Sequence, residues 1–398
     1  MPWVKGTDMD NKRLFLLEFI TGQFNVTELA KRYNVSRKTA HELINRFHKE
    51  GFEAVKDRPP VAKSCPHKTP DKIVEMILAV KKKNRRYGAR KIKAIIEREN
   101  PQMTIPPAST INSILARKGL TNQPKRIRRI KPQGKYFEAT KPNQIWTIDF
   151  KGDFKLPSEE RCYPLTVCDM KSRFILGIKA MPRARLQPSK RFFIKLFRKY
   201  GLPQYILSDN GRPFASPMSV ARLSRLSVWF IKLGITPLFI DPGAPQQNGK
   251  HERMHRELKA ECTLPPAKNM AAQQRAFNRF TDKHNTYRPH EALGNDTPQK
   301  HYHPSYIEYK TKNAPFAYAD HLVTRRVSRN GAIRWPGNRW LYVSTTLIEE
   351  DIALEKIDTH TYCVWFHNFK LGHFNTSTLR IVDYLGRTNR LSNTQVAS

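Results

Sequence analysis

The chain has 398 residues, enough for roughly two to four domains, and its 71 Lys and Arg against 34 Asp and Glu give a formal net charge of +37. A charge this large repels itself in a compact protein, which favours a polyanionic partner such as nucleic acid over a basic protein that is merely very soluble. No run of about 18 apolar residues, no signal-peptide pattern and no C-x-x-C pair among the five cysteines occurs, so the composition argues against a membrane protein and a disulfide framework.

The N-terminal residues predict a helix-turn-helix. Apolar periodicity between residues 11 and 52 indicates three short helices, with a cap at Thr27, a left-handed turn at Asn34 and a second cap at Ser36. The open side of the third helix carries side chains suited to phosphates and base edges in a major groove. The predicted DNA contacts there are Arg37, Lys38, His41 and Arg46. The alternative is a small helical domain with a solvated basic face.

A second helical unit and a basic tether follow. Three further segments with helical periodicity between about residues 70 and 119 predict a second helix-turn-helix. Residues 121–142 are rich in Lys and Arg and lack an apolar period, so this tether either tracks a DNA backbone or is simply solvated. The DNA contacts predicted in the tether are Arg126, Arg128 and Arg129.

From residue 144 the pattern changes to one of strands and helices. Alternation predicts a strand at 144–150, with Ile145, Thr147 and Asp149 on one face. The elements expected next, in chain order, are strands at 163–169 and 174–179, a helix at 189–200, a strand at 205–207, a helix at 219–233, a strand at 236–240 and a loop and helix at 241–259. The first three strands would be antiparallel, and the whole forms a mixed α/β layer.

Three carboxylates stand out in this region. Asp149 lies in an apolar strand, where an unpaired charge costs free energy unless it is paired or bound to a metal. Asp209 comes just after a strand, where α/β sheets usually present ligands, and Glu252 lies in the first turn of the helix that follows. Together the three can hold two Mg²⁺ ions, an arrangement that supports phosphoryl transfer. Three other acids receive structural roles: Asp153, Asp169 and Asp241.

The same helix also allows a different interpretation. His251, Glu252 and His255 match the H-E-x-x-H pattern, in which two histidines bind zinc and the glutamate is general base for peptide hydrolysis. The sequence offers no convincing third zinc ligand, and a net charge of +37 is of no help to a protease. In the favoured interpretation His255 and Arg256 orient Glu252, meet DNA or are solvated.

Three motifs carry a family resemblance. W-T-I-D-F at 146–150, S-D-N-G at 208–211 and P-Q-Q-N-G-K-H-E-R at 245–253 resemble the integrase-type catalytic core of DDE transposases, most of all the IS481 group, which is related to the IS3 group and to retroviral integrases. The resemblance covers nearly the whole chain. It implies an RNase H-like core in which Asp149, Asp209 and Glu252 are the catalytic and metal-binding triad, with two Mg²⁺ ions as cofactor and Mn²⁺ able to replace them.

The resemblance also extends to residues that would meet DNA. The family tends to have a basic residue seven positions after the glutamate, here Lys259, which lies two helical turns on and therefore on the same face. We add Lys250 as a further predicted DNA contact. The chain departs from the family in the 42 residues that separate Asp209 from Glu252, several more than is usual. The surplus is expected around 213–227, which leaves the geometry of that loop open.

The C-terminal third is predicted to change fold class. A helix at 271–287 and the segment 285–293, N-T-Y-R-P-H-E-A-L, resemble the family's closing motif for the core, whose physical content is little more than a helix stopped by proline. From about residue 315 a hairpin at Asn330-Gly331 and about five strands indicate a small barrel, which the family implies is SH3-like. The barrel would either bind DNA or hold subunits together. The basic residues that would bind DNA are Arg325, Arg326, Arg329 and Arg334.

The predicted organisation is therefore multidomain. It comprises a helix-turn-helix at 1–58, a second at 68–120, a basic linker at 121–142, an α/β RNase H-like core at 143–300, an all-β SH3-like barrel at 315–385 and a disordered tail at 386–398.

The function that the resemblance implies is that of a Mg²⁺-dependent DNA transposase. It would bind the terminal inverted repeats of a transposon, cleave the ends, and use the freed 3′-OH to attack target DNA. Two ends must be joined at once, so we expect a homo-oligomer, a dimer or higher, on double-stranded DNA. We expect it in the bacterial cytoplasm, at the nucleoid and without a membrane. The alternatives are a DNA-binding regulator with a relic core and an RNase H-type nuclease without a joining step.

Overall fold

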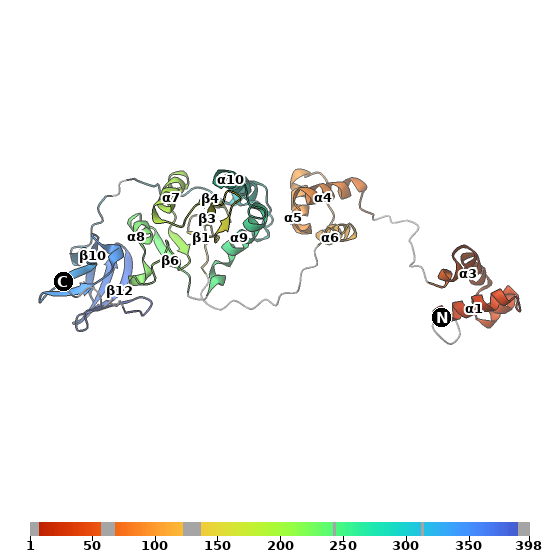
Figure 1. The fold of residues 1–398 in the computed structure, drawn as a ribbon. Coiled ribbons are helices and arrows are strands. Elements are labelled where there is room, and N and C mark those ends of the chain that lie inside the picture. The colour runs from red at the N-terminus through yellow and green to blue at the C-terminus, as the bar shows by residue number, and fades with distance from the viewer. Residues whose placement is uncertain (1–7, 57–67, 122–136, 242–243, 312–313, 389–398) are drawn as a thin grey trace. The chain divides into compact units, whose positions relative to one another are not determined.

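A computed structural model describes residues 8–56, 68–121, 137–241, 244–311 and 314–388 (Figure 1). The chain divides into two compact units, Met1–Pro70 and Asp71–Ser398, and each is described by itself. None of the helices in these segments is long and apolar enough to cross a membrane.

The first unit is helical throughout its described part. Its elements are α1 (Asp8–Thr21), α2 (Val26–Arg32), α3 (Arg37–Glu50) and a 3-10 turn at Gly51–Val55. Asn25, and not the expected Thr27, caps α2: the Asn25 side chain accepts from the Glu28 amide while the Glu28 carboxylate accepts from the Asn25 amide. Asn34 is left-handed with φ 55° and Ser36 caps α3, as expected. The reciprocal cap explains why the helix begins before Thr27.

The second unit begins with three more helices. These are α4 (Asp71–Lys83), α5 (Ala89–Glu99) and α6 (Ala108–Arg117). Each buries one apolar face, and Ile77, Ile92 and Ile111 have no exposed surface. Periodicity alone therefore places these helices correctly, because burial of an amphipathic face decides their packing.

A mixed sheet organises the central part of the second unit. Its strands are β1 (Ile145–Phe150), β2 (Phe154–Lys155), β3 (Arg161–Asp169), β4 (Ile175–Met181), β5 (Tyr205–Ser208) and β6 (Thr236–Phe239). β1, β3 and β4 are antiparallel neighbours, whereas β5 and β6 run parallel to β1, so the strand order is β2-β3-β1-β5-β6 with β4 also paired to β3. The antiparallel start is as expected; the short β2 was not anticipated, because two residues carry no usable period.

Helices cover both faces of this sheet. Trp146 and Ile148 of β1 pack with α7 (Leu186–Tyr200) and α8 (Arg225–Lys232) in one apolar cluster. On the other face, β3 and β4 pack with α9 (Gly249–Cys262) and α10 (Met270–Thr286) in a second cluster that includes Leu258 and Phe277. Alternation along β1 separates the two sets, so Thr147 and Asp149 face away from the Trp146 cluster.

The segment after α10 contributes more to the core than a helix stop. The Asn285 side chain makes two hydrogen bonds of 2.9 Å with the backbone of Ile175, extending the edge of the sheet. Arg288 is 3% exposed, and its guanidinium contacts Glu257 at 2.6 Å and Glu261 at 3.4 Å. Arg288 holds the pKa of Glu257 below its usual value despite burial. These two side chains fasten α9 and α10 to the sheet, which the sequence motif did not reveal.

We expect Arg288→Met to lower the free energy of unfolding by about 3 kcal/mol, because it removes the buried cation that contacts both Glu257 and Glu261 and leaves them the more exposed Arg86 and Lys283. Chemical denaturation monitored by circular dichroism measures the change. Arg279→Ala, an exposed position on α10, is the control and should change stability by less than about 0.5 kcal/mol. Equal losses for the two variants would mean that the buried ion pairs do not fasten the helices.

The C-terminal part is all β, but it differs from the expected barrel. Its strands are β7 (Val323–Arg326), β8 (Ala332–Trp335), β9 (Arg339–Tyr342), β10 (Asp351–Lys356), β11 (Thr361–Phe366), β12 (Phe369–Asn375) and β13 (Arg380–Asp383). They form a five-stranded antiparallel sheet in the order β13-β12-β11-β10-β7 and a separate β8-β9 hairpin. Among the described strands no pairing closes this sheet into a barrel.

The expected hairpin at Asn330-Gly331 is also wrong. Gly331 does make a turn with φ 79°, and its amide donates to the Ser328 carbonyl at 2.9 Å. The strands on either side nevertheless pair elsewhere, β7 with β10 and β8 with β9, and the hairpin turn of β8-β9 contains Gly337 and Asn338 at φ 78° and 57°. A turn signal fixes a local bend, whereas strand pairing depends on distant partners.

Candidate active site

The three predicted carboxylates come from three elements that meet at one edge of the sheet. In the parallel pair β1-β5, Thr147 lies opposite Leu207, so Asp149 and Asp209 follow two residues later along neighbouring strands. Glu252 lies in the first turn of α9, which packs against β1. The carboxyl ends of parallel strands and the start of a helix therefore bring acids that are 60 and 43 residues apart in sequence to one edge.

The charge of this edge acts on Asp149. Burial raises the pKa of Asp149 to about 7, and the negative charge of Asp209 and then of Glu252 adds to the rise. Its side chain is 20% exposed, so one side of the carboxyl is open to solvent. A carboxyl with a pKa this high is a group whose ionised form needs a cation nearby.

Asp209 is held by the turn that follows β5. The Gly211 amide donates to Asp209 Oδ1 at 3.1 Å, and a side chain at Gly211 would lie 3.1 Å from Oδ2 of the same carboxylate. The next residue, Asn210, donates to the Ile240 carbonyl at 2.9 Å. The S-D-N-G motif therefore combines a ligand-type carboxylate with a glycine that leaves room for it.

The donor chemistry of this edge suits Mg²⁺, which prefers carboxylate oxygens. Asp209 and the exposed Glu252 are near enough to Asp149 for their negative charges to raise its pKa. Even so, nowhere in the described segments do three or more His, Cys, Asp or Glu side chains converge closely enough to hold a metal ion as they stand. The arrangement is an open carboxylate edge, in contrast to a closed metal cage.

A chain of buried polar side chains lies behind Asp149. Thr166 has no exposed surface, and its Oγ1 lies 2.6 Å from His251 Nε2, 2.7 Å from His255 Nε2 and 2.9 Å from the Asp149 carbonyl oxygen. His251 Nδ1 lies 2.7 Å from Thr147 Oγ1. His255 Nδ1 lies 3.5 Å from Asp149 Oδ2. Two threonines and two histidines thus connect β1, β3 and α9 to the candidate catalytic carboxylate.

Burial keeps both imidazoles neutral. It lowers the pKa of His251 to about 3 and that of His255 to about 2, with His251 adding to the effect on His255. A neutral imidazole has one N–H donor and one acceptor nitrogen. The Thr166 hydroxyl donates to the Asp149 carbonyl oxygen, so the assignment that satisfies all the contacts has His251 and His255 each donating Nε2–H to Thr166 Oγ1 and Thr147 donating to His251 Nδ1, which leaves His255 Nδ1 as an acceptor that faces Asp149 Oδ2. We call these four residues the Thr-His relay.

The relay excludes the zinc-protease interpretation. Both ring nitrogens of His251 are hydrogen-bonded to hydroxyl groups, and His255 faces Thr166 and Asp149. Glu252 is exposed on a different side of α9. One predicted role of His255, to orient Glu252, is wrong, because the imidazole contacts Asp149.

The other acids have structural partners, as expected. Asp169 is 1% exposed and accepts from the Asn143 amide and from the amide and hydroxyl of Ser172. Asp153 pairs with Arg161, and Asp241 accepts from the Gln247 side chain at 2.7 Å.

The predicted DNA contacts occupy varied places. Lys250 and Lys259 are exposed on α9, as are Lys38 and His41 on α3. Arg37 donates to Thr27 Oγ1 at 2.6 Å and Arg46 to the Lys56 carbonyl at 2.8 Å, so these two side chains also brace the first unit. Three more predicted contacts lie outside the described residues: Arg126, Arg128 and Arg129.

Sequence reasoning missed the residues that lie behind the candidate carboxylates. Thr147 and Thr166 carry no motif of their own. The available signal was indirect: Thr147 alternates onto the face of Asp149, and His255 follows His251 by one helical turn. Their contacts depend on β3, whose position only the fold supplies.

Comparison with known proteins agrees with this geometry. Residues 139–245 and 233–298 match two models described as integrase core domains, and residues 12–62 match a helix-turn-helix domain. The central α/β unit is therefore an RNase H-like integrase core joined to an N-terminal helix-turn-helix, which implies DNA binding and polynucleotidyl transferase-type activity.

Similar proteins come from insertion elements and retroviruses. The uncharacterized 31.7 kDa protein of insertion element IS407 from Burkholderia multivorans is 29% identical over 54% of this chain and 75% of its own length. The 39.2 kDa protein of IS476 from Xanthomonas euvesicatoria is 27% identical over 58% of this chain and 65% of its own. The Gag-Pol polyprotein of baboon endogenous virus is 30% identical over 44% of this chain, which spans only 10% of that polyprotein.

A solved structure, the intasome of simian T-cell lymphotropic virus in complex with a PP2A regulatory subunit, aligns with 74% of this chain at 16% identity and a TM-score of 0.37. The matched domains and the insertion-element relatives together support an IS3-family-like integrase/transposase, in agreement with the predicted resemblance to integrase-type transposases.

Proposed function

We propose that this protein is a DNA transposase that binds the terminal inverted repeats of its element, cleaves the DNA ends and joins them to target DNA. Asp149, Asp209 and Glu252 are the proposed catalytic triad. The observation that carries the proposal is the meeting of these three acids, from β1, the turn after β5 and α9, at one edge of an integrase core, where burial, together with the negative charges of Asp209 and Glu252, raises the pKa of Asp149 to about 7.

The proposed cofactor is Mg²⁺, with Mn²⁺ as a substitute and two ions in the active complex. Asp149 and Asp209 would hold the ions and Glu252 would complete the set. Bound there, the ions would activate the attacking oxygen and stabilise the leaving one in an in-line phosphoryl transfer.

The chain's own residues would bind and position the DNA. Lys250 and Lys259 lie exposed on α9, the helix of Glu252, where their charges can meet phosphates that flank the reacting bond. The helix-turn-helix residues Lys38 and His41 would reach base edges in a major groove. Two ends are joined together, so the proposed active form is a homo-oligomer on the DNA of the bacterial nucleoid.

The proposed division of labour follows the predicted domain bounds. The two helix-turn-helix units, 1–58 and 68–120, would read the terminal inverted repeat, and the linker 121–142 would lie along the DNA backbone. The core, 143–300, would perform the chemistry.

A joining assay tests the proposal. The full chain is incubated with labelled duplexes that carry the DNA flanking its coding sequence, a supercoiled target plasmid, and Mg²⁺, Mn²⁺ or EDTA. We expect covalent joining of the labelled 3′ ends with either metal and none with EDTA. A duplex of scrambled sequence is the control for recognition of the repeat.

The same assay separates the alternatives. Nicking of labelled DNA without joined product would favour an RNase H-type nuclease. Sequence-specific binding with neither product, unchanged in Asp149→Asn, would favour a DNA-binding regulator with a relic core.

A further inference from the structure

The C-terminal β domain shares an apolar core with the catalytic domain. Val220 and Leu223 from the 3-10 turn Val220–Arg222 and its exit, together with Ile231 of α8, pack in one cluster with Ile352 and Phe374 of the β domain. All five side chains are buried. Lys232 of α8 also contacts Glu350 at 2.8 Å. The segment between Asp209 and Glu252 that we expect to carry the family's surplus residues is therefore the one that the β domain covers.

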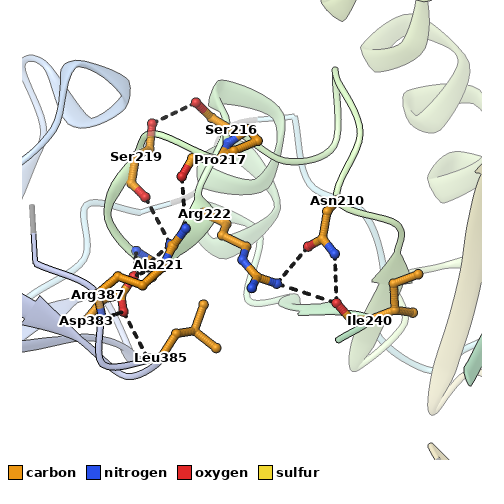
Figure 2. Close-up of polar contacts among 10 residues, drawn as sticks. All are labelled: Asn210, Ser216, Pro217, Ser219, Ala221, Arg222, Ile240, Asp383, Leu385 and Arg387. Carbon is orange, nitrogen blue, oxygen red and sulfur yellow. Dashed lines mark hydrogen bonds and ion pairs between the residues drawn. The ribbon is translucent and has the colours of Figure 1, made fainter. Parts of the chain in front are cut away.

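Two residues at the end of the β domain grip this segment (Figure 2). The Asp383 side chain is 3% exposed, and its carboxylate accepts from the Ala221 amide at 3.3 Å and from Arg387 Nη2 at 2.7 Å. Arg387 in turn donates to the Pro217 carbonyl at 2.9 Å and to the Ser219 carbonyl at 3.4 Å. The sequence predicts a disordered tail from residue 386, but Arg387 is held in place because its guanidinium donates to three acceptors.

The gripped segment has an unfavourable backbone conformation. Ala221 and Arg222 have φ values of 51° and 57°, in the left-handed region that non-glycine residues rarely adopt. Such residues persist where contacts from outside hold them in place. Asp383 supplies one of these contacts directly, at the Ala221 amide.

One side chain of the strained segment reaches the residue that follows Asp209. Arg222 Nη1 donates to Asn210 Oδ1 at 2.9 Å and to the Ile240 carbonyl at 3.5 Å. Asn210 also donates to the Ile240 carbonyl, and it is the neighbour of Asp209 in the chain. Figure 2 shows Arg222 between the two groups, with Asp383 and Arg387 on one side and Asn210 and Ile240 on the other.

We propose that the C-terminal β domain is an intramolecular support of the active site: Asp383 and Arg387 hold the 216–222 segment in its strained conformation, and Arg222 passes that constraint to Asn210 and so to Asp209. Arg222 and Arg387 are positioning residues in this arrangement. The role of Asp209 in catalysis rests on the proposed function, whereas the mechanical connection does not.

Hydrogen-exchange mass spectrometry of the full chain tests the connection without DNA. Arg387→Ala should speed exchange about tenfold in peptides covering 208–212 and 214–224, because the local opening free energy falls when the grip is lost. Arg222→Ala should speed exchange in 208–212 and leave the grip between Arg387 and Pro217 in place. Arg380→Ala, at an exposed position on β13, is the matched control and should change neither peptide. Arg387→Lys, which keeps the charge beside Asp383 and loses the fork, should give an intermediate effect if Arg387→Ala does not fold.

Joining activity gives the second readout. Both single variants should lower the joining rate about tenfold with DNA affinity unchanged, and the double variant should be no worse than Arg387→Ala alone, since the two residues act in series. Faster exchange confined to residues 384–388 in Arg387→Ala, with 208–212 unaffected, overturns the proposal. Faster exchange at 208–212 in a chain that never joins DNA leaves the support in place and overturns the proposed function instead.

Discussion

Asp149→Asn is expected to lower joining by at least about a thousandfold, equivalent to about 4 kcal/mol of transition-state stabilisation, and at the same time to make the metal-free protein more stable at pH 8. The loss follows from removing one oxygen ligand and the negative charge of the proposed metal site. The gain follows from removing a carboxylate whose ionisation is opposed by burial and by Asp209. Substitution of a purely structural residue would not combine a loss of joining activity with a gain in stability.

The pH dependence of the stability difference has a definite sign. The pKa of Asp149 is about 7 in the folded chain and 3.8 in its unperturbed state, so between these values the folded state keeps a proton that the unfolded state releases. The contribution of this group to stability is therefore full below about pH 4 and is lost as pH rises through 7. Asp149→Asn removes that dependence, and its advantage over the parent should grow from near zero at pH 4 to a few kcal/mol, at most about 4, at pH 8.

Thermal unfolding of both proteins across this pH range measures the difference. His251, whose depressed pKa acts in the opposite direction, is present in both proteins and cancels in the comparison, whereas His255 contacts Asp149 and contributes to the measured difference. Mg²⁺ should raise the melting temperature of the parent and leave that of Asp149→Asn unchanged. Asp153→Asn, an acid paired with Arg161 outside the triad, is the control and should keep full joining activity. An inactive Asp149→Asn that is less stable than the parent at pH 8 would contradict the buried-charge explanation.

The proposed triad could be predicted from the sequence because each acid has a local signature. Asp149 interrupts an apolar strand, Asp209 follows one, and Glu252 begins a helix, and these positions converge in any parallel β1-β5 pair flanked by that helix. Two of the three elements that bear them begin within one residue of the expected position. Periodicity predicts which face of an element a residue lies on and where the element ends, and these two properties were enough to place the three acids.

The supports of the site could not be predicted in this way. Thr166 contacts His251 and His255 across 85 and 89 residues, and Arg387 contacts Ser219 across 168. Such contacts depend on the register of β3 and on how the β domain packs, neither of which is written in a local pattern. The failed hairpin at Asn330-Gly331 has the same cause, since the partner of β7 is β10.

Thr166→Val is expected to have the second large effect, a loss of about 2–3 kcal/mol in the free energy of unfolding together with a lower joining rate. The substitution keeps the shape of the side chain and removes the hydroxyl that His251 and His255 share. Two buried imidazole nitrogens then lack a partner, and His255 is free to turn away from Asp149. Thr166→Ser, which keeps the hydroxyl, should retain most of both properties, since it loses only a methyl group.

A purely structural role for the relay would affect stability alone. If the relay also orients Asp149, the Mg²⁺ concentration needed for half-maximal joining should rise about tenfold in Thr166→Val, because a carboxylate that is no longer aligned binds the ion more weakly. The assay is run at a temperature where both variants are fully folded by circular dichroism. An unchanged Mg²⁺ requirement in a folded but less stable Thr166→Val would limit the relay to packing. A raised requirement, restored in Thr166→Ser, would make Thr166 and His255 positioning residues, because Thr166→Ser keeps the hydroxyl that contacts His255 and Thr166→Val lacks it.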